Sequence, residues 1–329
     1  DVPVVVATGR AMTAGSELPV GEAIERAVEQ LYDQTTQGVT VDSLTAGLLP
    51  PRFELTPASA AGARLLLEER EEAPAARALM GRQTPCVGRR RELAQLHTTW
   101  SWCCEEPTSS AVLVTAGFGV GKSRLAREFL ESIVPDAAAA GSEAEAGATA
   151  PQLLFARGDL LAASAYATVA PAIRQWAGLR SGQTGAEARA RLTGRLHIVM
   201  PDPAEAQRIA WFLGEVIGVT WPATVAGVAL EAARSDGQLM ADQIRSSFVA
   251  WIRALSDVSP VLLVLDDLHY ADVPSVQLVD HCLAEFEERP FMVLGLARPE
   301  VREAHPGLWS TQDLTELRLR PMARKAAEE

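Results

Sequence analysis

Hydrophobic and polar positions follow two different periods along this chain, and the two periods alternate. Short runs of apolar residues, many of them β-branched, are followed by longer stretches in which apolar residues recur every three or four positions, as on one face of a helix. The clearest short run, at 260–265, is continuously apolar and is followed by Asp266 and Asp267. A run of this kind predicts a strand that is buried on both faces, as in a parallel sheet.

The alternation is most regular in the second part of the chain. The pattern predicts strands at about 111–115, 153–156, 260–265, 291–296 and 314–319. It predicts helices at about 90–102, 123–133, 166–178, 204–218, 238–256 and 274–288. Strands that alternate with helices favour an α/β fold of three layers, in which helices cover both faces of a mainly parallel sheet.

The first 57 residues have shorter elements and read as a separate part. A β-branched run at 2–7, a helical pattern at 20–32 and strand-like runs at 39–41 and 52–55 come before Thr56-Pro57, which breaks the pattern. We therefore expect a small α+β fragment over residues 1–57.

Two segments lack the periodicity of a packed element. Residues 58–83 are rich in alanine and charged residues, which predicts a helical or partly flexible linker and places the α/β domain at 84–329. Residues 135–151 are mostly alanine, glycine and glutamate, a composition that cannot bury a core and predicts a surface loop.

Composition narrows the classes of protein and of partner. The 329 residues are enough for two domains, and 48% hydrophobic residues are enough for packed cores. A formal net charge of −12 disfavours nucleic acid and anionic membranes as general partners. No apolar run approaches the roughly 18 residues of a membrane helix. The four cysteines form no C-x-x-C pair and have no histidines at zinc spacing. We expect the adjacent Cys103 and Cys104 to be buried small apolar residues instead of a redox pair, and the location to be reduced and cytoplasmic.

The start of the chain is not typical of a complete protein. It begins with Asp1 instead of Met, and no basic segment precedes its first apolar run. We therefore expect a piece of a longer protein that has no secretory signal at this end.

Residues 116–123, Ala-Gly-Phe-Gly-Val-Gly-Lys-Ser, match the phosphate-binding pattern G-x-x-x-x-G-K-[ST] except at Ala116. In such a loop backbone N–H groups converge on phosphate in front of a helix N-terminus, and a predicted strand and helix flank this one. The residues expected to let the backbone approach are Gly117, Gly119 and Gly121. Lys122 would reach the β- and γ-phosphates, Ser123 would offer its hydroxyl to Mg²⁺, and Arg124 is a further nucleotide-binding candidate. An ordinary glycine-rich turn is the weaker reading, because average composition supplies such a match in only about 2–3% of chains this long.

The two acids after the run at 260–265 are the expected partner of this loop. Mg²⁺ bound to phosphate needs a carboxylate at the carboxyl end of a neighbouring strand. We expect Asp266 in the metal shell, mainly through water, and Asp267 in position to orient or deprotonate an attacking water. Alternatively, both are acids of an ordinary turn at the end of a strand.

Nearby polar residues extend the candidate site. Arg298 follows the strand predicted at 291–296, where an arginine could sense a γ-phosphate and stabilise transition-state charge, or could be a solvated loop residue. For His269 and Tyr270 a structural role in the loop is favoured over chemistry. Asp272 precedes Val273-Pro274 and is most simply the N-terminal cap of the next helix.

Three segments together carry a resemblance to a known family: VGRRRELAQL at 87–96, AGFGVGKSRLAREF at 116–129 and LLVLDDLHYADVPSV at 262–276. They resemble the AAA-like, origin-recognition-like module of bacterial signal-transduction ATPases with numerous domains, known as STAND ATPases, which occurs in LuxR-type regulators and multidomain serine/threonine kinases. The segments FARGDL, LGLARPEV and LRLRPM also resemble that module, so the likeness covers 84–322. It implies a P-loop NTPase fold, ATP or ADP as ligand, and Mg²⁺.

The resemblance also implies roles for single residues. Val87, Gly88 and Arg89 would lie near the adenine and ribose, and Arg298 would be the sensor beside the acidic pair. Pro321 would begin a helical lid that we expect to be missing from this chain. The sequence departs from the family pattern at Ala116 and at Gly117, where the family often has an acid.

Residues 1–56 resemble the C-terminal part of a class III nucleotide cyclase homology domain in the segments VPVVVATGR, PVGEAIERAVEQL and VDSLTAGLLPPRFEL. Active members have an asparagine and an arginine where this chain has Glu25 and Glu29, and a carboxylate cannot stabilise developing phosphate charge. Cyclase activity is therefore not expected. The resemblance further implies a kinase domain upstream and helical repeats downstream in the full polypeptide.

The leading expectation for function is a regulatory ATP-binding switch with slow Mg²⁺-dependent hydrolysis inside a larger bacterial signalling protein. Its partners would be ATP, other domains of the same polypeptide and, through self-association, further copies. Three alternatives stay open: a nucleotide-binding module without turnover, a DNA-loading ATPase of the replication-initiator type, and a small-molecule phosphotransferase.

Overall fold

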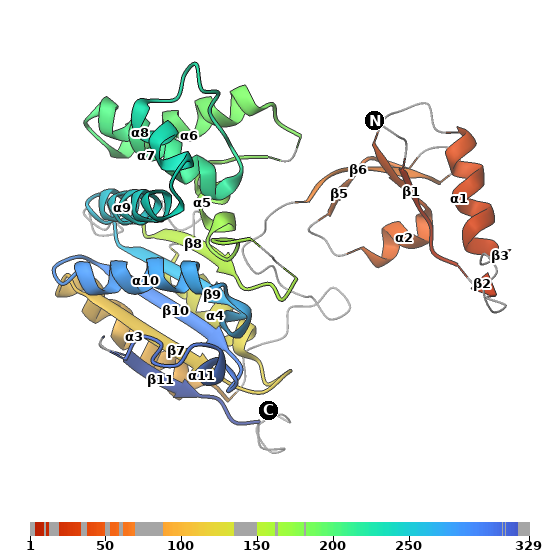
Figure 1. Ribbon diagram of the computed structural model, residues 1–329. Coiled ribbons are helices and arrows are strands. Elements are labelled where there is room, and N and C mark those ends of the chain that lie inside the picture. Colours follow the sequence, from red (N-terminus) through yellow and green to blue (C-terminus); the bar gives the residue numbers. More distant parts are fainter. Residues whose placement is uncertain are drawn as a thin grey trace, which may run out of the picture. The chain divides into compact units, whose positions relative to one another are not determined.

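The computed structural model describes most of the chain, and the following refers to the described residues. They are 4–9, 11–12, 20–33, 38–49, 53–58, 62–69, 88–134, 150–161, 164–180, 182–310, 312 and 314–321. The chain divides into two compact units, one formed by residues 1–75 and 180–182 and the other by 76–179 and 183–329 (Figure 1). Each unit is described separately below.

The first unit is a small α+β structure, as predicted. Its main sheet has the strand order β1-β4-β6-β5, with β1 parallel to β4 and the other pairs antiparallel. These strands are β1 (Val4–Val6), β4 (Val39–Val41), β5 (Phe53–Leu55) and β6 (Arg64–Glu69). The remaining elements are α1 (Glu22–Asp33), α2 (Ser43–Leu48) and the short pair β2 (Ala11–Met12) and β3 (Val20–Gly21).

The prediction of a helical or partly flexible linker at 58–83 is wrong at residues 64–69. This segment is strand β6, in which Leu65 pairs with Thr40 of β4 and Leu66 pairs with Val39 of β4 and Leu55 of β5. An apolar run flanked by charges suits either a helix or a strand, and here the partners on both sides decide in favour of the strand. Residues 70–83 of the predicted linker lie outside the described residues.

The second unit is built on five strands that are all parallel. The strands are β7 (Ser109–Thr115), β8 (Gln152–Arg157), β9 (Val261–Asp266), β10 (Phe291–Ala297) and β11 (Leu314–Arg318). Their order in the sheet is β11-β7-β10-β9-β8. The predicted α/β fold with a mainly parallel sheet is confirmed.

The strand order corrects one expectation about the site. The strand that ends in the two acids, β9, was expected beside β7, which leads into the 116–123 loop. Instead β10 lies between them and pairs with both along most of its length. Periodicity in the sequence carries no information about strand order, so this placement could not be read from the pattern.

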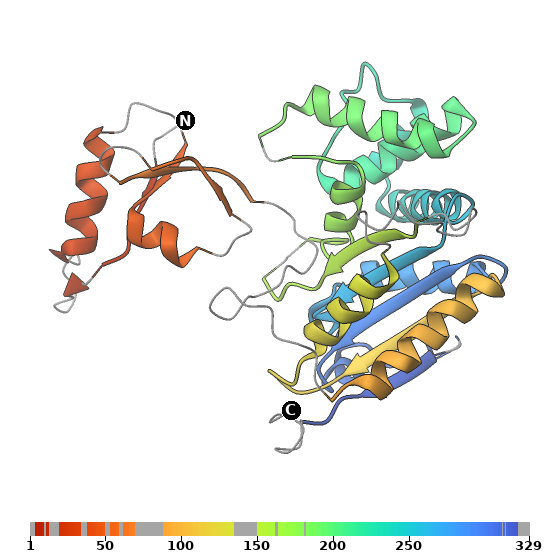
Figure 2. The same ribbon diagram turned by 180° about the vertical axis from the view of Figure 1, so that it is seen from behind.

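Helices cover both faces of the sheet, which completes the predicted three layers. The helices α3 (Arg90–Glu105) and α4 (Lys122–Ile133) lie on one face of the sheet (Figure 2). They share a core with alternate strand residues such as Val112 and Leu262. On the opposite face Leu113 and Leu263 belong to a larger core, which is covered by α5 (Ala170–Trp176), α7 (Pro203–Ile217), α9 (Gly237–Ser256) and α10 (Val273–Glu285). Side chains of successive strand residues therefore point to opposite helical layers.

Four short or unpredicted elements complete the second unit. They are α6 (Gly185–Val199), α8 (Val228–Arg234), the 3₁₀ turn η1 (Leu268–Tyr270) and α11 (Val301–Ala304). The surface loop predicted at 135–151 falls largely outside the described residues, since 135–149 are not described. Among the helices that are described, none has both the length and the apolar character required to span a membrane.

Candidate functional site

The 116–123 loop opens at the carboxyl edge of the parallel sheet. Because all five strands run in the same direction, the segments after β8, β9 and β10 reach this same edge. Open α/β sheets bind their ligands at such edges. The charges of Asp266, Asp267 and Arg298 all act on the pKa of Lys122, so the structure brings these predicted residues into one group.

Backbone conformation explains two glycines of the loop. Gly119 has φ +73° and Gly121 has φ +101°, a left-handed region that other residues seldom adopt. A Cβ at either position would meet nothing within 4 Å, so the backbone, not space, requires glycine there. Gly121 also caps the N-terminus of α4, at which Lys122 and Ser123 are the first helical residues.

Ala116 fits the loop despite its departure from the pattern. Its side chain is buried in the core beneath α3 and α4, and its N–H donates to the carbonyl of Ala297 at the end of β10 (3.2 Å). Its φ is not positive, so an alanine methyl group costs nothing in backbone strain. Ala116 therefore anchors the start of the loop to the neighbouring strand.

Lys122 turns back over its own loop. Its Nζ donates to the carbonyl oxygens of Ala116 (3.0 Å) and Gly117 (3.3 Å). Burial lowers the pKa of Lys122, while the nearby carboxylates of Asp266 and Asp267 raise it, and the net result is a lowered pKa. The ammonium group is thus held at the mouth of the loop by weak, replaceable partners.

The two acids at the end of β9 have different surroundings. Asp266 is half-buried, and its Oδ1 accepts a hydrogen bond from the N–H of Asp267 (2.9 Å). Burial, reinforced by the negative charge of Asp267, raises the pKa of Asp266. Asp267 has φ +49°, a left-handed conformation that aspartate tolerates better than most residues, and its Oδ2 accepts a hydrogen bond from Arg157 (3.1 Å).

Arg157 and Gly158, at the end of β8, contact the candidate site, although their residue types did not mark them as site residues in the sequence. Arg157 pairs with Asp267, and the N–H of Gly158 donates to the carbonyl of Asp266 (2.9 Å). A Cβ at Gly158 would lie 2.7 Å from Ala271 N and closer still to Asp267 O. The sequence signal for these two residues is the segment FARGDL at 155–160, which contains both and resembles the family.

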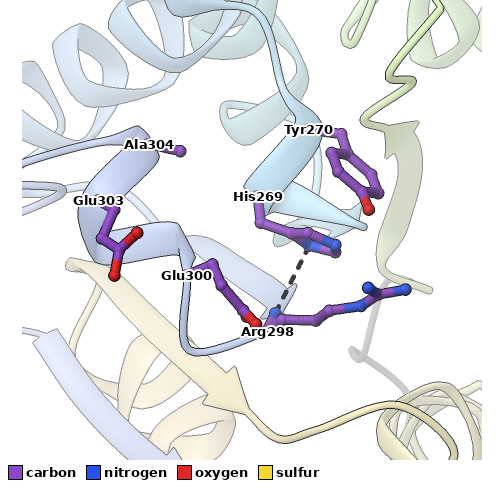
Figure 3. Close-up of a pocket in the computed structure, with 6 residues that line it drawn as sticks. All are labelled: His269, Tyr270, Arg298, Glu300, Glu303 and Ala304. Carbon is purple, nitrogen blue, oxygen red and sulfur yellow. Dashed lines mark hydrogen bonds between the residues drawn. The ribbon is translucent and has the colours of Figure 1, made fainter.

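Arg298 follows β10 and contacts residues that follow the two neighbouring strands, β7 and β9. Its guanidinium lies 5.6 Å from the ring centroid of Phe118 in the loop and 5.8 Å from that of Tyr270, which follows β9. Its backbone N–H donates to Nδ1 of His269 (3.5 Å), as Figure 3 shows. These contacts place Arg298 between the 116–123 loop and the turn of Asp266 and Asp267 at the end of β9, called the acidic turn below.

A cavity of about 370 Å³ opens beside these residues (Figure 3). It is lined by His269, Tyr270, Arg298, Glu300, Glu303 and Ala304. His269 is 8% exposed, and its ring centroid lies 4.0 Å from that of Tyr270. Burial lowers the pKa of His269, which keeps its ring neutral near pH 7. On the described residues, His269 Nε2 has no hydrogen-bond partner.

Asp272 is the N-terminal cap of α10, as predicted. Its carboxylate accepts hydrogen bonds from Ser275 N–H and Oγ, from Thr168 N–H and Oγ1, and from Tyr166 N–H, all between 2.8 and 2.9 Å. Burial opposes ionisation, but the hydrogen bonds from Thr168 and Ser275 outweigh it and hold the pKa of Asp272 below its usual value. This cap ties the segment after β9 to the segment after β8.

The remaining candidates lie around α3 and α4. Val87 lies outside the described residues, and Gly88 is exposed with φ +71°. The Arg89 guanidinium is buried and donates to the carbonyls of Val120 (3.1 Å) and Arg320 (2.8 Å), so it ties the loop to the segment after β11. Arg89 also pairs with Glu92 at 3.2 Å, and Arg124 pairs with Glu128 at 2.7 Å.

A divalent cation would find few protein ligands here. In the described part of the chain, no cluster of three or more histidine, cysteine, aspartate or glutamate side chains could hold a metal ion. Ser123 and Asp266 fit the pattern of Mg²⁺ sites in which one or two protein oxygens act together with phosphate and water. The raised pKa of the half-buried Asp266 is consistent with a carboxylate whose charge a cation would balance.

The chain matches one protein family and resembles several solved structures. Residues 85–294, more than half of the chain, match the family described as AAA ATPase domain. Similar solved structures include the Aeropyrum pernix ORC2 protein in ADPNP-ADP complexes, with 13% identity, a TM-score of 0.34, and coverage of 70% of this chain and 48% of that chain. Drosophila ORC bound to AT-rich DNA and Cdc6 has 11% identity, a TM-score of 0.29, and coverage of 72% of this chain and 61% of that chain. In both, the chain spans less than two thirds of the solved chain. No curated protein matches the sequence.

Proposed function

The chain belongs to the AAA ATPase domain family, and on this premise we propose that its second unit binds ATP on loop 116–123 and hydrolyses it slowly with Mg²⁺. The observation that carries the proposal is the meeting of Lys122, Asp266, Asp267 and Arg298 at one edge of a parallel sheet. ATP and ADP would make different contacts there, so the unit would act as a regulatory switch.

Binding follows from the loop and the start of α4. The backbone N–H groups around Gly119 and Gly121 and the N-terminus of α4 attract phosphate. Lys122 would exchange its two carbonyl partners for phosphate oxygens, because a hydrogen bond between two charged groups is the stronger one. Ser123 and Asp266 would hold Mg²⁺, which when bound neutralises charge on the phosphate oxygens. The segment 87–89 would lie on the nucleoside side, with Arg124 flanking the phosphates.

Hydrolysis needs a water in line with the terminal phosphate and positive charge to stabilise the transition state. In this proposal Asp267 orients that water and Arg298 supplies the charge. Asp267 shares its carboxylate with Arg157, and Arg298 lies against two aromatic rings. Rearrangement of both contacts before the reaction would make hydrolysis slow.

The output of the switch would reach other domains of a larger bacterial signalling polypeptide. In this proposal the first unit is the end of a cyclase homology domain without cyclase activity. Glu25 and Glu29 lie on α1 where catalysis would require groups that stabilise phosphate charge. Conversion of ATP or GTP to a cyclic nucleotide by this unit would contradict that assignment.

A calorimetric titration with ATP and ADP in the presence of Mg²⁺ tests the site. Lys122→Ala should lower ATP affinity at least about 100-fold, since two hydrogen bonds to charged groups are lost. Arg245→Ala is the matched control because it also removes one positive charge, from an exposed ion pair with Asp242 on α9. Equal affinity in the wild type and Lys122→Ala would show that the loop is not the nucleotide site.

Turnover is tested separately from binding. Asp267→Asn should retain ATP affinity and lower the hydrolysis rate by about 10²–10⁴-fold, the usual contribution of a general base. If the wild type binds ATP but releases no phosphate above the Asp267→Asn background, the unit is a nucleotide-binding module without turnover.

A further inference from the structure

His269 contains a buried hydrogen-bond donor for which no described residue is the acceptor. Its Nδ1 faces the backbone N–H of Arg298, which can only donate, so Nδ1 is the acceptor nitrogen of the ring. The neutral ring must then carry its proton on Nε2. Within the described residues Nε2 has no partner, although the ring is more than nine-tenths buried.

An unpaired buried donor is costly, and most are satisfied in folded proteins. In Figure 3 the Nε2 end of His269 points to the same side as the Tyr270 hydroxyl and the Arg298 guanidinium. That guanidinium lies over Phe118 of the 116–123 loop. The free N–H is therefore directed toward the region between the loop and the acidic turn, beside the 370 Å³ cavity that His269 lines.

The surrounding charges restrict what this donor can bind. Asp267, Arg298, Lys122 and Glu300 all act on His269 through their charges. Two of these are cations that attract an anionic oxygen. Of the two acids, Asp267 is already paired with Arg157, and in Figure 3 Glu300 lies on the side of the His269 ring away from Nε2. The N–H group of His269 is therefore suited to donate a hydrogen bond to an anion that lies between Lys122 and Arg298.

We propose that His269 Nε2–H donates a hydrogen bond to an oxygen of the terminal phosphate of the bound nucleoside triphosphate and so helps to distinguish triphosphate from diphosphate. This inference rests on the proposed ATP site. Through Nδ1, the same ring reports the presence of that phosphate to the backbone of Arg298 at the end of β10. His269 is thus a binding residue on one side and a positioning residue for Arg298 on the other.

Two substitutions separate the two ring nitrogens. His269→Asn keeps an acceptor near the position of Nδ1 and removes the distal donor, whereas His269→Gln places an amide N–H near the position of Nε2. Titrations with Mg²⁺ and either ATP or ADP should show about a 10-fold loss of ATP affinity in His269→Asn, with ADP affinity unchanged. His269→Gln should recover most of the preference for ATP.

The outcomes distinguish this inference from the proposed function. If the wild type and Lys122→Ala bind ATP equally, the ATP site itself is refuted. If Lys122→Ala loses ATP while His269→Asn keeps the wild-type ratio of ATP to ADP affinity, the site stands and the role of His269 is overturned. Equal losses for ATP and ADP in His269→Asn would also overturn it, because a structural role would weaken both. A lower turnover with an unchanged affinity ratio would assign His269 to Asp267 instead of to phosphate.

Discussion

Substitution of Gly158 by alanine tests how closely the end of β8 holds the acidic turn after β9. An added Cβ would lie 2.7 Å from Ala271 N and 2.8 Å from Tyr270 C, both backbone atoms that cannot rotate away. Ordinary contacts begin at 3.4 Å, so one segment must move by more than the 0.7 Å that Ala271 N alone requires, because the backbone oxygen of Asp267 lies closer still. The φ of Gly158 is not positive, so lack of space is the reason for glycine here.

The cost in stability follows from two opposing effects. Overpacking of this kind destabilises by about 1–3 kcal/mol. The loss of backbone freedom in the unfolded chain returns about 0.4–1 kcal/mol when glycine becomes alanine. A net loss of about 1–2 kcal/mol is expected, which for a unit of this size lowers the melting temperature by about 2–8 °C.

The effect on turnover should be larger than the effect on stability. The segment that must move includes Asp267, and a shift of about 1 Å at a catalytic group can cost about 100-fold in rate. ATP affinity should change little, because β10 and β9 separate β8 from β7, the strand that leads into the 116–123 loop. Denaturant unfolding, calorimetric titration and phosphate release measure the three quantities independently.

The matched control is Gly194→Ala in the interior of α6, where an added Cβ meets nothing within 4 Å. That variant should be more stable by about 0.5–1 kcal/mol, because alanine favours a helix over glycine. If Gly158→Ala were as stable as Gly194→Ala and hydrolysed ATP at the wild-type rate, the packing of β8 on the acidic turn would have no functional weight.

Two further variants probe contacts on either side of this turn. Asp272→Ala should destabilise the second unit by about 3 kcal/mol, because a helix cap is lost and buried donors of Thr168 and Ser275 are left unpaired. Denaturant unfolding measures this loss, and Asp236→Ala, which removes a more exposed cap on α9, is the control. The pKa of Asp272 is lowered in the folded protein, so its contribution to the free energy of unfolding is complete above the unfolded pKa of about 3.9. That contribution is lost as the pH falls through the lower folded pKa. A difference in unfolding free energy between Asp272→Ala and wild type that is equal at all pH values would contradict this. Phe118→Ala should leave stability within about 0.5 kcal/mol, because the ring is 87% exposed, but should raise ATP affinity about 2- to 5-fold, since Arg298 no longer gives up a cation–π contact of about 0.5–1 kcal/mol. Weaker ATP binding by Phe118→Ala would mean that the ring positions Arg298 for the ligand.

Local patterns in the sequence predicted most elements of the second unit, because each strand and helix carries its own period. The run at 260–265 became β9, with alternate residues facing opposite helical layers, and the helix after Lys122 lies where it was expected. The helices α6 and α8 were not predicted, and β6 was assigned to a linker. In these places the local pattern is ambiguous and partners distant in the sequence decide the structure.

The candidate residues could be selected from the sequence, but their present contacts could not. Lys122, Asp266, Asp267 and Arg298 were chosen because their types suit phosphate chemistry, and the sheet brings them together. The pairing of Arg157 with Asp267 depends on β8 being the neighbour of β9, and the burial of Arg89 depends on the segment after β11. Strand order and long-range packing are properties of the whole fold, and no local pattern encodes them.

The position of β10 has a mechanical consequence for the site. Because β10 pairs with both β7 and β9, its end lies between the loop and the acidic turn, and Arg298 contacts a ring from each side. Under the proposed function, a phosphate that draws the Arg298 guanidinium toward it would weaken its contacts with Phe118 and Tyr270, and the backbone N–H of Arg298 links this position to His269 of η1. The turn after β9 is in turn tied to β8 through Arg157 and Gly158. Under the proposed function, phosphate at the 116–123 loop would therefore act on the ends of β10, β9 and β8 through these contacts.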